Sequence, residues 1–321
     1  MTQARPVLLG VDVGGTKVGV ALATPELEVV ARGQIETRAD EGAEQVVRRA
    51  CALARSLVEA HGVRVIAVGA VSPGVPKTDR VLLAPTIGGW EDLHFAASVR
   101  SGLGALIGDD VDVVVGNDVK AGALAEHRSG GLRDATTGLY VNLGTGIAMA
   151  VVVDGVVLTG AHGASGEVAY QHTAPGQAGA GDDRAPLEEL VGGRVLDEAT
   201  TRAAGRPTTV VEALRADDAS VRSALEPALA ALDVALVNAC CLLDPDVVVV
   251  AGGLMNAADA LLPRLRRAVE RGAPVAPTVV AARHTFDAPL VGALHLAADA
   301  LQDHQTRTPP PQHRLPTQEL A

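Results

Sequence analysis

The stretch VLLGVDVGGTK, residues 7–17, carries an apolar run into an aspartate and a glycine turn. A second apolar run follows at once, so we expect two strands joined by the turn at 14–17. Glycine lacks a Cβ atom and accepts positive φ, so such a turn can bring backbone N–H groups close to a phosphate. Asp12 could hold the metal that accompanies the phosphate. An ordinary hairpin turn explains the same residues.

The composition is typical of a globular protein of about two domains. The 321 residues are 48% hydrophobic and carry a net charge of −11. Lysine and arginine do not cluster with aromatic residues, and neither a leader pattern nor a long uninterrupted apolar segment is present. The three cysteines have neither metal-site nor disulfide spacing. These features predict a cytoplasmic protein without nucleic-acid or membrane partners.

The pattern of the first half of the chain returns in the second half. In the first half, strands are expected at 7–13, 18–23, 27–35, 64–71 and 111–115, with helices at 43–61 and from 118 to about 126. In the second half, strands are expected at 139–143, 147–153, 156–159, 246–251 and 278–283, with helices at 186–204, 208–215, 217–243, 254–271 and 288–301. The repeat predicts an α/β fold of two βββαβα lobes that share a cleft beyond the carboxyl ends of their strands.

The lobes can be bounded from the same pattern. We expect an N-terminal lobe at 1–116, onto which the final helix at 288–302 packs back, and a C-terminal lobe at 117–287. The segment 303–321 is predicted to be a disordered tail, because it is rich in proline and lacks apolar periodicity.

Five motifs occur in an order known from one protein family. They are VDVGGTK at 11–17, Asn117-Asp118, NLGTGIAMAVVVDG at 142–155, GASGEVAY at 163–170 and PDVVVVAGGL at 245–254. In this order they resemble the ROK family of sugar kinases and repressors, over about residues 7–300. The resemblance implies the two-lobed actin-like (RNase-H-like) ATPase fold, with ATP, Mg²⁺ and a sugar in the cleft. Relatives are commonly homodimers.

The resemblance also implies roles for residues on the ATP side. Asp118 would accept the proton of the attacking sugar hydroxyl, for which a carboxylate suffices because the transition state of phosphoryl transfer is loose. Asn117 would hydrogen-bond the sugar, although both residues are also common helix N-caps. Asp12 would hold Mg²⁺ through water. The implied ATP and phosphate contacts are Gly14, Gly15, Thr16, Lys17, Gly144, Thr145, Gly146, Gly252 and Gly253. Two of these assignments have simpler alternatives: Lys17 could be a solvated side chain, and Gly252 and Gly253 could form a tight turn without a ligand.

The sugar side departs from the family pattern. Glu167 is kept, but Tyr170 stands where the family carries a histidine and Thr86 where it carries an asparagine. Gly74 and Glu188 complete the expected substrate contacts, and a glutamate such as Glu188 is also common in the first turn of a helix.

The segment that follows lacks the cysteines with which the family binds zinc. No structural zinc is therefore expected, and 171–185 is interpreted as a mobile surface loop. His172, Asp182 and Asp183 lack the spacing of a replacement metal site. Lys120, which is unusual for the family, is interpreted as a solvated helix residue.

Altered sugar contacts predict an altered sugar, because a site built for particular hydroxyl groups rejects sugars that leave its polar groups unpaired. The carboxylates of Glu167 and Glu188 could pair with an ammonium. We therefore expect an ATP-dependent kinase for the 6-hydroxyl of a glucose-like hexose. An amino sugar such as kanosamine (3-amino-3-deoxyglucose), on which some relatives in antibiotic biosynthesis act, is favoured.

Several alternatives remain open. The protein could be an ordinary glucokinase, a C7-cyclitol kinase or a sugar-binding protein without turnover. A sugar-sensing ROK regulator is disfavoured by the acidic charge, by the retained Asp118 and by the short stretch of eleven residues before Asp12.

Overall fold

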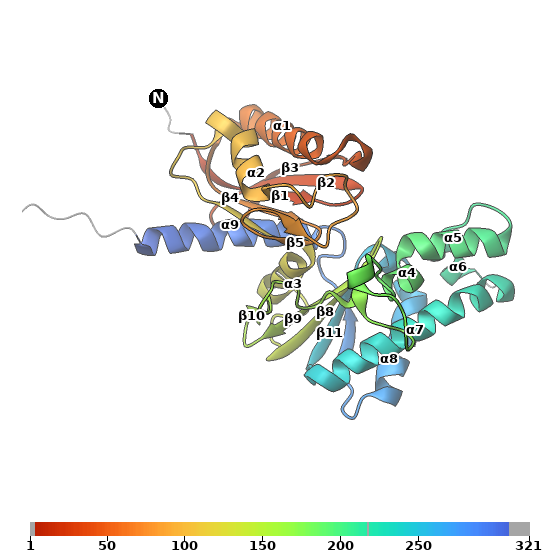
Figure 1. Cartoon of the computed structure of the whole chain (residues 1–321). Helices are drawn as coiled ribbons and strands as arrows, with labels where there is room; N and C mark the ends of the chain where they lie inside the picture. Colours follow the sequence, from red (N-terminus) through yellow and green to blue (C-terminus); the bar gives the residue numbers. More distant parts are fainter. Residues whose placement is uncertain (1–3, 217, 308–321) are drawn as a thin grey trace, which may run out of the picture.

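The computed structural model describes residues 4–216 and 218–307. Two five-stranded sheets form its body (Figure 1). The first has the order β3-β2-β1-β4-β7 and consists of β1 (Pro6–Val13), β2 (Lys17–Ala23), β3 (Val29–Glu36), β4 (Arg64–Ser72) and β7 (Val113–Asn117). The second has the order β10-β9-β8-β11-β12 and consists of β8 (Thr137–Leu143), β9 (Ile147–Val153), β10 (Val156–Val157), β11 (Val247–Ala251) and β12 (Thr278–Ala281).

The two sheets have the same topology. In each, three consecutive strands form an antiparallel meander, and the two later strands run parallel to the first strand of that meander. The predicted α/β fold with duplicated βββ units is confirmed. Because the parallel strands are buried on both faces, they consist of nearly continuous Val, Leu, Ile and Ala runs.

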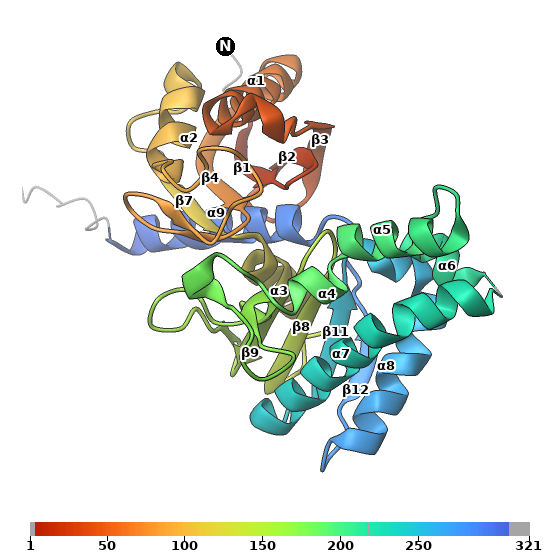
Figure 2. The same ribbon diagram turned by 45° about the vertical axis from the view of Figure 1, so that its right-hand side comes forward.

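Helices cover both faces of each sheet (Figures 1 and 2). The first sheet packs on one face against α1 (Ala43–His61) and α2 (Phe95–Leu103), and on the other against α9 (Ala288–Arg307). The second sheet has α3 (Asp118–Ser129) on one face and the α4–α8 group on the other, which comprises α4 (Glu188–Val191), α5 (Gly193–Ala204), α6 (Val210–Arg215), α7 (Ala219–Leu243) and α8 (Ala258–Gly272). A two-stranded ribbon, β5 (Val75–Pro76) with β6 (Val81–Leu82), follows β4.

Helix α9 lies on a floor of glycines in the first sheet, formed by Gly10, Gly19, Gly69 and Gly116. A Cβ atom at Gly69 would come within 1.9 Å of the carbonyl oxygen of Ala293, so only glycine lets the helix backbone approach this closely. The helix also packs against α3 and therefore contacts elements associated with both sheets. The division into lobes at 116/117 stays a prediction.

Some predicted boundaries are wrong. Strand β7 covers Val113–Asn117 and not 111–115, because the N–H of Val111 donates to Gly108 O and closes a turn before the strand. The predicted helix at 186–204 is two helices, because Gly192 between them has an extended backbone.

The predicted tail at 303–321 is also partly wrong. Helix α9 continues to Arg307, since residues 303–307 contain neither proline nor glycine and the first proline of the tail stands at 309. Residues 308–321 lie outside the described residues.

Helix α7 is the one described helix that is long and apolar enough to cross a membrane, judged by length and composition. Its inner side is part of the larger hydrophobic core of the second half of the chain, where Leu225, Leu232 and Leu236 are at most 3% exposed. The helix therefore has the packing of a core helix.

Candidate functional site

A cleft of about 800 Å³ opens where the carboxyl ends of β1, β4, β7 and β8 meet. Eleven residues predicted from the sequence line it: Gly15, Thr16, Gly74, Thr86, Asn117, Asp118, Thr145, Gly146, Glu167, Tyr170 and Glu188. Six others do not line it directly: Asp12, Gly14, Lys17, Gly144, Gly252 and Gly253. Most of the first group lie at or just beyond the carboxyl ends of strands, as expected for ligand sites in such sheets, and Glu188 comes from the first turn of α4.

The first glycine turn is fixed by backbone and side-chain hydrogen bonds. Gly14 N donates to Lys17 O at 2.9 Å, and Thr37 Oγ1 donates to Gly14 O at 2.6 Å. Thr37 N also donates to Thr16 O at 2.9 Å. Lys17 begins β2 and is exposed. The turn is held from the side of β3, while Gly15 and Thr16 face the cleft.

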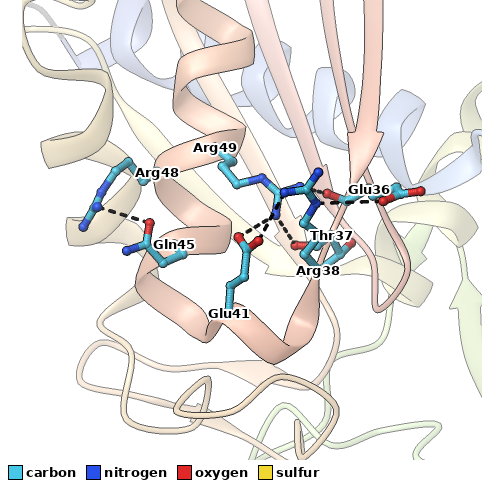
Figure 3. Close-up of polar contacts among 7 residues, drawn as sticks. All are labelled: Glu36, Thr37, Arg38, Glu41, Gln45, Arg48 and Arg49. Atoms are coloured by element: carbon cyan, nitrogen blue, oxygen red, sulfur yellow. Dashed lines mark hydrogen bonds and ion pairs between the residues drawn. The ribbon is translucent and has the colours of Figure 1, made fainter.

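Arg49 of α1 contacts the end of β3 next to this turn, and Figure 3 shows its contacts with Glu36, Thr37 and Glu41. Its guanidinium donates to the carbonyl oxygens of Glu36 and Thr37, and it pairs with Glu41 Oε2 at 3.0 Å. Because Thr37 in turn holds Gly14, the helix, the end of β3 and the turn form one connected polar network.

The second glycine turn, Gly144 to Gly146, is closed by a hydrogen bond from Gly144 N to Gly146 O at 3.0 Å. Glu188 lies directly on it, since its Oε2 accepts from Ile147 N at 3.2 Å. A Cβ atom at position 146 would sit 1.9 Å from this oxygen. Glu188 thus lines the cleft and braces the second turn from α4.

Gly252 and Gly253 follow β11 beside the second turn. Gly252 has φ of +96°, and a Cβ atom there would lie 2.4 Å from Leu143 O at the end of β8. A tight turn between β11 and the next helical segment therefore requires glycine at 252. Its position next to β8 also suits a nucleotide site, whose assignment stays a prediction.

Asn117 caps helix α3 and is tied to the facing loop. Its Oδ1 accepts from Lys120 N at 2.9 Å, and its Nδ2 donates to Gly74 O at 2.8 Å. The predicted N-cap thus exists at Asn117. Asp118, the first residue of the helix, is left facing the cleft, with Oδ1 accepting only from Val119 N among the described hydrogen bonds (2.8 Å).

Asp12 and Asp118 form an acidic pair. Burial raises the pKa of Asp118 to about 6, although the Val119 N–H and the Lys120 charge act against it. Burial, and then repulsion by Asp118, raises the pKa of Asp12 to about 8. A divalent cation would stabilise the ionised form of Asp12, and carboxylate oxygens are the donors that Mg²⁺ prefers. Asp12 therefore fits a Mg²⁺ ion.

The part of the cleft around Tyr170, where the sequence predicts the sugar, is strongly acidic. Burial raises the pKa of the Tyr170 hydroxyl, and four carboxylates raise it further: Glu167, Glu188, Glu91 and Asp183. Glu91, which the sequence analysis missed, accepts from Ala84 N at 3.0 Å and thereby shapes the loop that carries Thr86. Its only sequence signal is its position after Trp90, the single tryptophan of the chain.

Lys120 is not a solvated helix residue. It is 9% exposed, and its Nζ lies 3.7 Å from Glu167 Oε1. The cap at Asn117 sets the first turn of α3, so position 120 faces inward. The sequence interpretation of this residue was wrong because the partner comes from a distant loop.

The loop at 171–185 is organised by polar contacts. Gln177 Oε1 accepts from Thr173 N at 2.7 Å and from Ala174 N at 2.9 Å, and Asp182 Oδ2 accepts from Gly179 N at 3.3 Å. Within residues 4–216 and 218–307, no group of three or more His, Cys, Asp or Glu side chains could hold a metal ion. Mobility of this loop stays a prediction.

Comparisons with known proteins agree with this architecture. The sequence profile of the ROK family matches residues 8–300. The glucokinase of Halalkalibacterium halodurans is 26% identical over 287 residues, which cover 82% of this chain and 84% of that protein.

Two solved structures share the fold. The ROK hexokinase of Thermus thermophilus has a TM-score of 0.73 at 29% identity, and the match covers 92% of this chain and 99% of that one. A ROK family glucokinase of Streptomyces griseus, in complex with glucose and AMPPNP, has a TM-score of 0.76 at 24% identity, with 91% and 99% covered. The protein thus has the actin-like kinase fold. It belongs to the ROK family.

Proposed function

We propose that this protein is an ATP-dependent sugar kinase that transfers the γ-phosphate of ATP to the 6-hydroxyl of a glucose-like hexose. The observation that carries the proposal is the meeting of two glycine turns and the Asp118 carboxylate in one cleft. Support comes from the similarity to a named glucokinase and a named hexokinase of the family, and from the complex of the Streptomyces griseus enzyme with glucose and AMPPNP.

In this proposal the residues of the chain position and deprotonate the acceptor. Asp118 accepts the proton of the attacking hydroxyl, and Asn117 and Glu167 orient the sugar. The turns at Gly14–Thr16 and Gly144–Gly146 direct backbone N–H groups to the phosphates. Asp12 would hold Mg²⁺ through water, and the ion would neutralise phosphate charge when bound.

For the substrate we propose an amino sugar such as 3-amino-3-deoxyglucose. Six carboxylates line the cleft, namely Glu91, Asp118, Glu167, Asp183, Glu188 and Glu189, against the two guanidinium groups of Arg184 and Arg194. This excess of negative charge favours a substrate cation. Glucose is the second candidate, favoured by the Lys120–Glu167 ion pair, which already satisfies one carboxylate inside the protein.

The test of the substrate is a coupled ADP-release assay over glucose, mannose, N-acetylated hexosamines, 3-amino-3-deoxyglucose and valiolone-type cyclitols. We expect the highest kcat/KM for the amino sugar. The Glu91→Gln variant keeps the Oε1 acceptor for Ala84 N but removes the charge, so the amino-sugar-to-glucose ratio should fall by about tenfold. Glucose turnover far above that of amino sugars and cyclitols would show that the substrate is misassigned. Sugar binding without ADP release would favour a sugar-sensing regulator or a sugar-binding protein without turnover.

The pH dependence of turnover reports on Asp118. Its carboxyl must be unprotonated to act as a base, and its pKa of about 6 lies above the ordinary value. At saturating MgATP we therefore expect kcat/KM for the sugar to be flat above that pH and to fall about tenfold per pH unit below it. Circular dichroism over the same range separates this effect from acid unfolding. A rate that stays constant down to about pH 4.5 would exclude Asp118 as the base.

The cytoplasmic location and the homodimer stay predictions.

A further inference from the structure

Lys120 is a buried cation that the proposed chemistry does not use. Its side chain is 10% exposed and that of Glu167 is 16% exposed, with 3.7 Å between Nζ and Oε1. Lys120 itself does not line the cleft, whereas Glu167 does. The ammonium therefore pairs with a carboxylate of the cleft from a residue that is not itself part of the lining.

We propose that Lys120 is a positioning residue that holds the Glu167 carboxylate in place at the sugar site. This inference rests on the proposed function, because it takes Glu167 as a sugar contact. Within the described part of the chain, Lys120 is the only cation paired with Glu167. It belongs to the same first turn of α3 as Asp118, so the pair ties the sugar contact to the helix that carries the base.

The physical reason is the cost of an unpaired charge in a crowded site. Glu167 lies near Asp118 and Glu188, and both burial and these charges oppose its ionisation. Without Lys120, the carboxylate would take up a proton or turn to solvent. Either change removes the charged acceptor that a sugar hydroxyl needs, since hydrogen bonds to ionised groups are the stronger ones.

The backbone of the loop that carries Glu167 also supports a fixed position for its carboxylate. Glu167 follows Gly166, whose φ is +83° and whose Cβ position would overlap Met149 O at 1.9 Å. Gly166 O in turn accepts from Met149 N at 2.9 Å. The backbone before Glu167 is thus fixed on β9, and the ion pair fixes the end of the side chain.

Steady-state kinetics of the Lys120→Met variant test the proposal. We expect KM for glucose, and for the preferred sugar, to rise by about tenfold or more, while KM for MgATP stays within about twofold. Lys120→Arg should recover most of the loss, because the guanidinium keeps the charge. Arg128→Met is the matched control, because Arg128 lies on the same helix as Lys120 but forms an exposed ion pair with Asp299 of α9. Its loss should leave both KM values unchanged.

A double-variant cycle decides between positioning and general folding. If Lys120 acts through Glu167, adding Lys120→Met to Glu167→Gln should change the sugar KM by less than about twofold. A further tenfold loss in that background, or equal changes in both KM values for the single variant, would overturn the proposal. If Lys120→Met alone fails to fold, the double variant, in which neither charge is left unpaired, can still be compared with Glu167→Gln. An equal sugar KM in these two proteins supports the proposal.

Calorimetric titration with glucose separates this inference from the proposed function. If the wild-type protein binds glucose without forming ADP, the kinase proposal fails. Weaker glucose binding in Lys120→Met than in Arg128→Met would still support the positioning role. Equal binding in both variants would overturn it.

Discussion

The Asp118→Asn variant is expected to lose about 10³-fold in kcat, because general base catalysis contributes roughly 10²–10⁴-fold. The substitution is close to isosteric, and the new amide oxygen can still accept from Val119 N, so helix α3 should begin as before. The KM values for the sugar and for MgATP should change little. The loss therefore isolates proton transfer from binding.

The same substitution at an exposed aspartate is the control. Asp109 lies in an exposed turn before β7, and Asp109→Asn should leave kcat unchanged. The measurement is ADP release at saturating sugar and MgATP for the three proteins. If Asp118→Asn retained more than about a tenth of wild-type kcat, Asp118 would not be the base.

The Gly69→Ala variant is expected to lose about 3 kcal/mol of the free energy of unfolding, at the upper end of ordinary overpacking costs. The new methyl group would lie 1.9 Å from Ala293 O, a backbone atom that can move only if α9 moves. Burial of Leu290 and Leu294 in the first sheet depends on that same close approach. Catalytic residues are not touched, so the effect is on stability.

Gly88→Ala is the matched control for stability. Nothing lies within 4 Å of a Cβ atom at this position, so its effect should stay within about 0.5 kcal/mol. Urea unfolding followed by circular dichroism gives both values. Superimposable unfolding curves for the two variants would mean that α9 does not need the glycine floor.

The sequence allowed the fold to be predicted because its signals are local. Apolar runs of strand length, and a glycine turn after the first strand of each half, are visible without any tertiary information. The duplicated topology follows from that repeat. The predicted site residues at 15–16, 117–118 and 145–146 could be brought together for the same reason, since they follow strands whose carboxyl ends point the same way.

The structure of the segment between β4 and β7 could not be predicted from such local signals. It is organised by Trp90, which is 1% exposed and packs its ring 5.4 Å from that of Phe95. Such a contact follows neither a strand nor a helix period, so β5, β6 and the role of Glu91 were missed. Lys120 shows the same limit, because its partner Glu167 comes from a loop of another part of the chain.

The packing of α9 also sets an order of events during synthesis. Leu8, Ala21 and Ala67 of the first sheet are made before the second sheet, but the residues that cover them, Leu290 to Ala298, are made after it. One face of the first sheet therefore stays exposed to solvent until the second sheet has been translated. Contacts of such large sequence separation slow folding and expose apolar surface to aggregation. A chain cut short before residue 288 would lack the cover for this face and should depend on chaperones to stay in solution.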